Sequence, residues 1–223
     1  MVPAWEALRR LQEGNRRFVS GARSGAFTSA ARRLELVNGQ SPFAVILGCS
    51  DSRAPVELIF DQGFGDLFVI RVAGNVAASS QIGSVEFAAG EFGARLVVVL
   101  GHTQCGAVQA ALSQLMASPG GGPHNLQFIV DQIRPVVERL LTDGPPSGPA
   151  ELKRLAVRAN VRRNVERLRS GSPLIERLIR EDGLMVVGAV YSLETGVVDF
   201  FEGLDGTGEA YGIEAGGRSA PAG

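Results

Sequence analysis

The sequence predicts an α/β fold with a short, mainly parallel central sheet flanked by helices and preceded by an N-terminal helical arm. Short runs rich in Val, Ile and Leu lack apolar/polar alternation, which is typical of strands buried on both faces. Segments of helical character separate these runs, as parallel strands require. The last run is followed, across a tight turn, by an antiparallel partner. We therefore expect about four parallel strands plus an antiparallel edge strand.

The N-terminal arm is the first predicted element. Trp5, Leu8, Leu11 and Phe18 recur at helical spacing with charged residues between them, so residues 3–20 form an amphipathic helix. Such a helix needs an apolar surface to cover.

The remaining elements follow from apolar runs, helical spacing and turn residues. Strands are expected at residues 43–48, 66–72, 95–101, 183–191 and 197–202. Helices are expected at residues 55–61, 79–92, 106–116, 125–141, 150–169 and 172–181. Gly- and Pro-rich loops are expected at residues 118–124 and 143–149. The organisation is a single domain: a helical arm over 1–40, an α/β unit over 41–203 and a partly disordered tail over 204–223.

Composition excludes several classes of protein. The 223 residues contain only 2 Cys and 2 His, too few for a disulfide framework or for repeated zinc fingers. The net charge of -1 argues against a nucleic-acid binder. No apolar run approaches the roughly 20 residues of a membrane span, and the N-terminus lacks a secretory pattern. We expect a cytoplasmic protein with reduced thiols.

Chemistry-bearing residues follow two of the predicted strands. Cys49 comes just after the first strand, and His102 and Cys105 come just after the third. Ligands gather at the carboxyl ends of parallel strands, so these three side chains are expected to converge. A buried Cys or His taken singly is more often a core residue. Together they predict a zinc site with an open fourth position, which is typical of catalytic zinc.

Asp51 and Arg53 lie beside the first predicted ligand. If the loop is extended, their side chains point the same way as Cys49. A carboxylate there can accept a hydrogen bond from an attacking water, while the guanidinium keeps it ionised. A weak surface ion pair is the ordinary alternative.

At this point the sequence resembles the β-class carbonic anhydrases. Cys-x-Asp-x-Arg over 49–53 and His-x-x-Cys-Gly over 102–106 match the family's motifs. Similar segments also lie at residues 13–18, 60–71, 73–75 and 84–87. The resemblance covers nearly the whole chain to about Glu202.

The resemblance implies an activity and a set of site residues. The activity is reversible hydration of CO2 to bicarbonate and a proton by one zinc ion per subunit. Cys49, His102 and Cys105 would bind zinc, and Asp51 with Arg53 would form the catalytic dyad. The substrate pocket would comprise Gln40, Phe68, Ala73, Phe87 and Gly106, with Phe87 in place of the usual tyrosine. The arm would embrace the neighbouring subunit of a homodimer, or of a larger assembly of dimers.

One branch of the family has a closed state in which the dyad aspartate becomes the fourth zinc ligand. Bicarbonate stabilises that state in a pocket of Trp, Arg and Tyr. Arg71 and Tyr191 match two of these residues, but Ile46 stands at the Trp position. Because Ile offers no N–H, we expect Asp51 to stay paired with Arg53.

Other readings compete with this one. A hydrolase of carbonyl sulfide or carbon disulfide could use the same metal motif, and only assays would separate the two. A zinc-binding assembly protein would be expected to close the fourth position with another protein ligand. A Cys49–Cys105 redox couple would leave His102 without a role. The basic stretch 153–169 also contains Leu, Val and Glu, which indicates a solvated face or a subunit contact more than a nucleic-acid site.

His124 lies in a predicted Gly- and Pro-rich loop, so we expect it to be exposed rather than to act as a proton relay.

Overall fold

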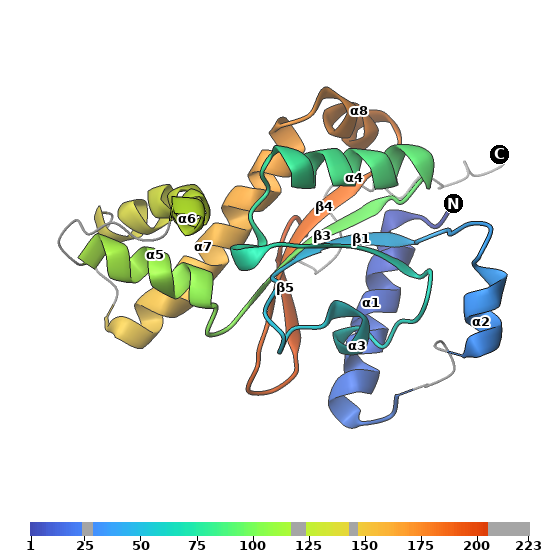
Figure 1. Ribbon diagram of the computed structural model, residues 1–223, viewed down its shortest axis with the longest axis horizontal. Coiled ribbons are helices and arrows are strands. Elements are labelled where there is room, and N and C mark those ends of the chain that lie inside the picture. The colour runs from blue at the N-terminus through green and yellow to red at the C-terminus, as the bar shows by residue number, and fades with distance from the viewer. Residues whose placement is uncertain (24–28, 117–123, 143–146, 205–223) are drawn as a thin grey trace, which may run out of the picture.

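The computed structural model describes residues 1–23, 29–116, 124–142 and 147–204. Five strands form one sheet in the order β2-β1-β3-β4-β5. All neighbouring pairs are parallel except β4 and β5, which are antiparallel. The predicted fold class is confirmed, with helices on both faces of the sheet (Figure 1). The strands are β1 (Ala44–Gly48), β2 (Leu67–Arg71), β3 (Leu96–His102), β4 (Met185–Tyr191) and β5 (Val198–Glu202).

The helices agree with most of the sequence expectations. They are α1 (Ala4–Ser20), α2 (Ala30–Glu35), α3 (Val56–Ile59), η2 (Ala73–Asn75, a 3-10 turn), α4 (Ser79–Glu91), α5 (Gly106–Met116), α6 (His124–Thr142), α7 (Pro149–Ser170) and α8 (Pro173–Glu181). The sequence did not predict α2 or η2. His124 was expected in a loop, but it is the first residue of α6. The rest of the predicted loop 118–124 lies outside the described residues, as does the predicted tail from residue 205 onward.

Side-chain alternation along the central strands gives the sheet two cores. Val45 and Leu47 of β1 belong to the core beneath α4, α5, α7 and α8. Ala44 and Ile46 belong to the opposite core, together with Ala7 and Leu11 of α1. The strand sequences show no polar alternation because both faces of the sheet are buried.

Helix α1 covers its own chain's sheet. Its buried face packs with the second core, so the apolar surface that its amphipathic pattern required is supplied within the chain. Trp5, on the outer side of α1, remains exposed. Contact of residues 1–40 with a neighbouring subunit stays a prediction.

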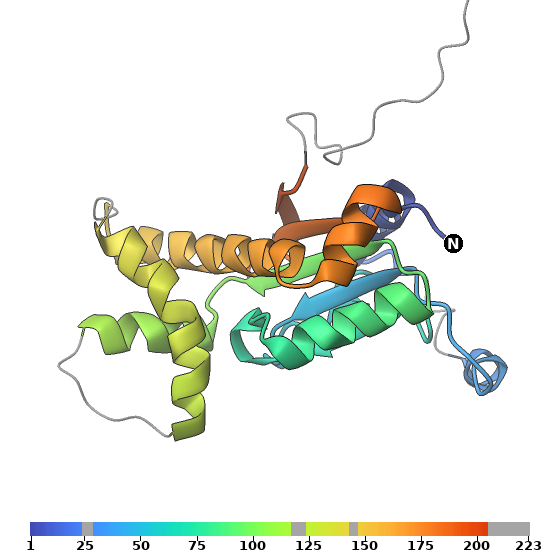
Figure 2. The ribbon, with the colours of Figure 1, turned by 90° about the horizontal axis from the view of Figure 1, so that it is seen from above.

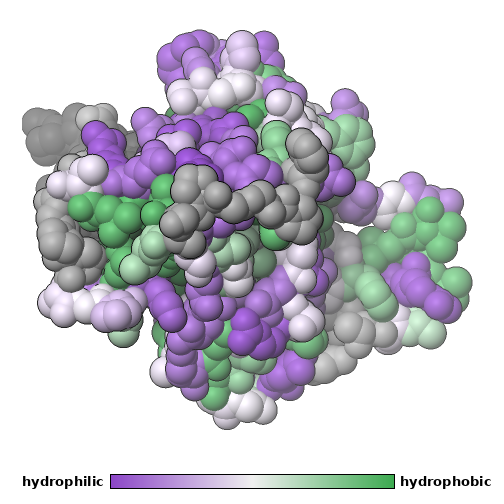
Figure 3. All heavy atoms as spheres, turned by 60° about the vertical axis from the view of Figure 1, so that its left-hand side comes forward, coloured by the Kyte–Doolittle hydropathy of each residue, from purple (hydrophilic) through white to green (hydrophobic). Residues whose placement is uncertain are grey.

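Helix α7 lies close against the sheet and extends beyond it (Figure 2). Glycines in two strands permit the close approach, because a Cβ on Gly101 or Gly188 would lie 2.7 or 2.8 Å from Val161 of α7. The projecting part of α7 packs with α5 and α6. On that side of the molecule hydrophilic and hydrophobic residues are mixed over the surface (Figure 3), and Met116 and Phe128 are exposed there. No helix within the described ranges is long and apolar enough to span a membrane.

Candidate metal centre

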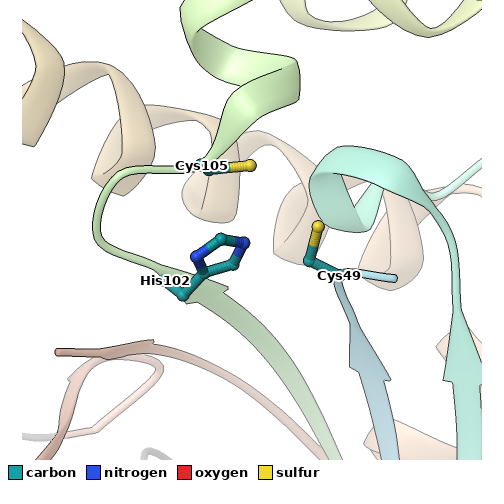
Figure 4. A group of neighbouring side chains, drawn as sticks. All are labelled: Cys49, His102 and Cys105. Carbon is teal, nitrogen blue, oxygen red and sulfur yellow. The ribbon is translucent and has the colours of Figure 1, made fainter. Parts of the chain in front are cut away.

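Three predicted ligands meet at the carboxyl edge of the sheet. Cys49 follows β1, His102 ends β3, and Cys105 precedes α5 (Figure 4). One ligand atom from each residue lies within 4.8 Å of the others, and all three residues are buried. A tetrahedral zinc with bonds of roughly 2.0–2.3 Å separates its ligand atoms by about 3.5 Å. The cluster therefore needs little adjustment to hold zinc.

The orientation of the His102 ring supports a metal ligand. Nδ1 lies 2.9 Å from the carbonyl oxygen of Thr103, so Nδ1–H donates to that oxygen. Nε2 is consequently the nitrogen with a free lone pair, and it is buried with no hydrogen-bond partner among the described residues. A buried unpaired nitrogen is costly unless something fills the position. A metal ion facing Nε2 would satisfy it, and the imidazole would be fixed by its carbonyl partner as in known zinc sites.

A strained turn joins His102 to Cys105. Gln104 has a φ of 57°, in the left-handed region that side chains other than glycine seldom adopt. This turn directs the Cys105 sulfur back toward the end of β3. Strain of this kind tends to concentrate at functional sites, where the surrounding structure holds it in place.

The two thiols influence each other strongly. The Cys105 thiol donates to Cys49, and together with the Gly74 N–H it lowers the pKa of Cys49 to about 4. The same interaction, with burial, raises the pKa of Cys105. With its pKa raised, the Cys105 thiol holds its proton against the Cys49 sulfur. A bound cation would displace that proton, because zinc ligates thiolates.

Asp51 and Arg53 form a bidentate ion pair beside the cluster. Arg53 Nε and Nη2 lie 2.9 and 2.8 Å from the two carboxylate oxygens. These hydrogen bonds hold the pKa of Asp51 well below its usual range. Asp51 Oδ2 also lies 3.8 Å from His102 Nε2, at the edge of the ligand cluster. The carboxylate is thus placed to reach a group bound in the fourth metal position.

The loop that carries this pair is a turn rather than the extended segment considered from the sequence. The backbone N–H of Arg53 donates to Asp51 Oδ1, and the N–H of Ala54 donates to the Asp51 carbonyl. The short Asp side chain favours this turn by bonding its own backbone two residues on. The turn, not strand-like alternation, brings Arg53 onto Asp51.

Arg71 and Tyr191 have different surroundings in the part of the chain that the structure describes. Arg71 donates to the carbonyl oxygens of Cys49 and Asp51, at 3.0 and 2.7 Å. Tyr191 is buried in the core beneath α1, where Ile46 also lies. Asp51 is paired with Arg53, and its expected retention of that pairing beside zinc stays a prediction.

The five predicted pocket residues fall into two groups. Ala73 precedes Gly74, whose N–H donates to Cys49 Sγ, and Gly106 directly follows Cys105, so both lie at the cluster. Phe68 and Phe87 instead pack against Phe92, with ring centroids 5.3–6.1 Å apart. Gln40 lines a hollow of about 530 Å³ that Phe92 and Phe64 also line. We call Gln40, Phe64, Phe68, Phe87 and Phe92 the aromatic patch.

The aromatic patch is distant from the cluster of the same chain. Phe68 pairs with Val45 in the sheet, and Val45 lies four residues before Cys49. At about 3.3 Å per residue, the two positions are separated by roughly 13 Å along the strands. Phe68 therefore does not line the metal position within one chain.

Sequence reasoning missed Gly74, Asn160 and Asn164. Gly74 bonds the Cys49 sulfur, Asn160 bonds Gly74, and Asn164 bonds Asn160. The available signal was a pair of Asn residues at i,i+4 spacing on the apolar face of a helix. Their target is a loop about 86 residues earlier in the chain, and no local sequence pattern links the Asn residues to that loop.

Comparison with known proteins identifies similar families and folds. The family model described as "Carbonic anhydrase" matches residues 44–198. "Carbonic anhydrase 2" of Mycobacterium tuberculosis is 40% identical over 200 residues, which cover 87% of this chain and 90% of that protein. "Carbonic anhydrase" of Mycolicibacterium smegmatis is 36% identical over 208 residues, covering 93% and 97%.

Solved structures agree. A β-carbonic anhydrase of Aspergillus fumigatus superposes with a TM-score of 0.69 at 27% identity, covering 87% of this chain and 88% of that one. A β-carbonic anhydrase of Sordaria macrospora, described as tetrameric, gives 0.68 at 25% identity, covering 76% and 85%.

Proposed function

Because this chain belongs to the β-class carbonic anhydrase family, we propose that Asp51 and Arg53 are its catalytic dyad and that Cys49, His102 and Cys105 hold its zinc. Its activity is the reversible hydration of CO2 to bicarbonate and a proton. The observation that carries the site assignment is the buried two-sulfur, one-nitrogen cluster with the Asp51 carboxylate at its edge.

Bound zinc supplies a Lewis acid that lowers the pKa of a water molecule in the fourth position. Asp51 lies at the edge of the cluster, where its carboxylate would accept a hydrogen bond from a water held there and so orient that water toward CO2. Arg53 keeps the carboxylate ionised and fixed in orientation by two hydrogen bonds. Because the pKa of Asp51 is so low, the carboxylate orients the water rather than storing its proton. The proton must then pass to solvent or buffer.

An Asp51→Asn variant tests the dyad. The amide keeps the shape of the side chain but loses one acceptor and the charge that pairs with Arg53. We expect stopped-flow CO2 hydration to fall by roughly 100-fold or more, while zinc content measured by atomic emission remains one per chain.

A matched control is Asp199→Asn, which breaks the exposed pair between Asp199 and Arg158. It should leave both CO2 hydration and zinc content unchanged. Wild-type turnover in Asp51→Asn would contradict the role of Asp51 while leaving the zinc assignment intact.

We also propose that a second copy of the chain completes the substrate pocket. Ala73 and Gly106 lie at the cluster, whereas Phe68 lies about 13 Å away along the strands. Phe87 packs against Phe68, and Gln40 lines the hollow beside Phe92. A pocket built from all five needs the aromatic patch of a partner subunit. CO2 has no net charge or dipole, so phenyl rings suit it, and an amide such as that of Gln40 suits bicarbonate. Support comes from exposed Phe64 and Phe87 and from the tetrameric Sordaria macrospora relative.

The cytoplasm is the compartment that the cluster favours. Cys49 and Cys105 are free thiols that lie close together. In an oxidising compartment they could form a disulfide and lose the thiolates that zinc requires. Cell fractionation followed by immunoblotting tests this. Recovery of the chain mainly in an oxidising compartment would contradict it.

A further inference from the structure

Two amide side chains are buried in the middle of α7. Asn160 and Asn164 are 1% and 2% exposed, one helical turn apart. Asn164 Nδ2 donates to the Asn160 carbonyl at 2.8 Å and to Asn160 Oδ1 at 3.1 Å. Since Asn160 Oδ1 accepts from Asn164, the Asn160 amide group is fixed with its Nδ2 pointing off the helix. Burying such groups is tolerated only when they are bonded.

Both amides form hydrogen bonds to the backbone of the loop that contains η2. Asn160 Nδ2 donates to the Gly74 carbonyl at 2.8 Å, and the Ala77 N–H donates to Asn164 Oδ1 at 2.7 Å. The loop is thus held at two points, three residues apart. On its other side, the Gly74 N–H donates to Cys49 Sγ at 3.4 Å.

Gly74 has little freedom to move. Its φ is 69°, and a Cβ there would lie 2.9 Å from Ile133 and 3.1 Å from Ala107. These neighbours belong to α6 and α5, so the backbone is packed from that side. The direction of the Gly74 N–H is therefore decided by the Asn160 bond and by this packing.

The N–H···S bond has a chemical consequence. A hydrogen bond to a thiolate draws charge from the sulfur, so the sulfur donates less to a metal. Two thiolates already offset the charge of Zn²⁺, and weakening one donor leaves a stronger Lewis acid. The bond also fixes the direction of the sulfur lone pairs.

We propose that Asn160 and Asn164 are positioning residues of the metal centre: through Gly74 they aim an N–H at the Cys49 sulfur and so limit the electron donation of that thiolate to zinc. The inference rests on Cys49 being a zinc ligand. It differs from an ordinary structural role of buried Asn, because the effect reaches the metal.

The absorption spectrum of cobalt-substituted protein distinguishes a positioning role at the metal from a purely structural role of the buried Asn residues. Thiolate-to-cobalt charge-transfer absorption reports the energy of the sulfur lone pairs, independently of CO2 hydration. Asn160→Ala leaves the Gly74 loop without its anchor, so the band should shift to longer wavelength.

Asn15→Ala is the matched control. Asn15 is also a buried amide, bonded to the carbonyls of Ile59 and Gly196 and to the Val198 N–H, but it lies in α1 on the opposite face of the sheet. It should lower thermal stability while leaving the cobalt band at its wild-type wavelength. If Asn160→Ala behaves like Asn15→Ala, the role is structural and the proposal is wrong.

Asn164→Ser is a milder variant in case Asn160→Ala does not fold. It removes the donor that orients the Asn160 amide, so a smaller band shift in the same direction is expected. An unshifted band in folded Asn164→Ser would overturn the proposal. If wild-type cobalt protein shows no thiolate band at all, the ligand assignment of Cys49 fails instead.

Discussion

The metal cluster and the aromatic patch lie on the same sheet but differ in how far one chain completes them. Cys49, His102 and Cys105 are all nearly inaccessible, and their surrounding hydrogen bonds lie within the chain. In the patch, Phe64 and Phe87 are 45% and 52% exposed. Apolar rings in a contiguous exposed group commonly mark an interaction surface. The comparison separates a metal cluster that one chain builds from a proposed pocket that we expect to need two.

Strand position explains this difference. β1 and β3 are interior neighbours, so the residues at their carboxyl ends are enclosed by the loops and helices that follow. β2 is an edge strand, and its Phe68 packs with Phe87 and Phe92 on the face of the sheet that α4 covers. Edges of sheets in soluble proteins are usually covered or otherwise protected.

The largest effect on zinc content and activity is expected for Cys49→Ala, which removes one of the three ligands of the metal cluster. Stoichiometric zinc and CO2 hydration should be lost together, because two remaining ligands hold zinc far more weakly. Metal analysis and stopped-flow hydration measure both. A far-UV circular dichroism spectrum like that of the wild type distinguishes loss of the site from loss of the fold. Retention of zinc and activity would refute the cluster as the metal site.

An intermediate effect is expected for Phe87→Asp, which places a charge in the aromatic patch. The dimer dissociation constant should rise on the order of tenfold or more, since a buried interface aromatic contributes roughly 2 kcal/mol. Sedimentation velocity measures this. CO2 hydration should fall with dissociation, while zinc content per chain stays constant.

Phe128→Asp is the matched control, because Phe128 is similarly exposed but lies on α6. Its dimer and its activity should remain those of the wild type. If Phe87→Asp changes neither association nor turnover, the patch is not part of a shared pocket.

The smallest effect is expected for Thr103→Val, next to His102. Thr103 Oγ1 donates to Glu194 at 2.8 Å and accepts from the Leu193 N–H at 3.0 Å, which ties the metal loop to the β4–β5 turn. Losing these bonds should lower the free energy of unfolding by about 1 kcal/mol. Urea denaturation measures it, and zinc content should not change.

The Thr103 effect should depend on pH. The Thr103 hydroxyl is the main cause that lowers the pKa of Glu194 from its ordinary value of 4.5. Stabilisation from this bond is therefore present above pH 4.5 and lost as pH falls through the lower pKa of the folded state. The difference between wild type and Thr103→Val should shrink in acid. A difference that grows in acid would contradict the bonding role of Glu194.

Several features of the fold lay beyond sequence reasoning for physical reasons. Helix α2 has six residues and buries none of them, so no apolar periodicity marks it. The η2 turn depends on the positive φ of Gly74, where packing against α5 and α6 leaves no room for a side chain. The turn at Asp51 replaced an expected extended loop because the Asp side chain bonds the backbone of Arg53.

The sequence by itself determined the buried parallel sheet and the convergence of Cys49, His102 and Cys105. Both follow from short-range patterns: apolar runs define the strands, and residues just past parallel strands share one edge. Only the tertiary structure decided which ring nitrogen of His102 is free, that Asn160 reaches Gly74, and that Phe68 lies away from the cluster. Those depend on strand register and on how closely α7 packs against the sheet, and packing between distant segments leaves no local pattern in the chain.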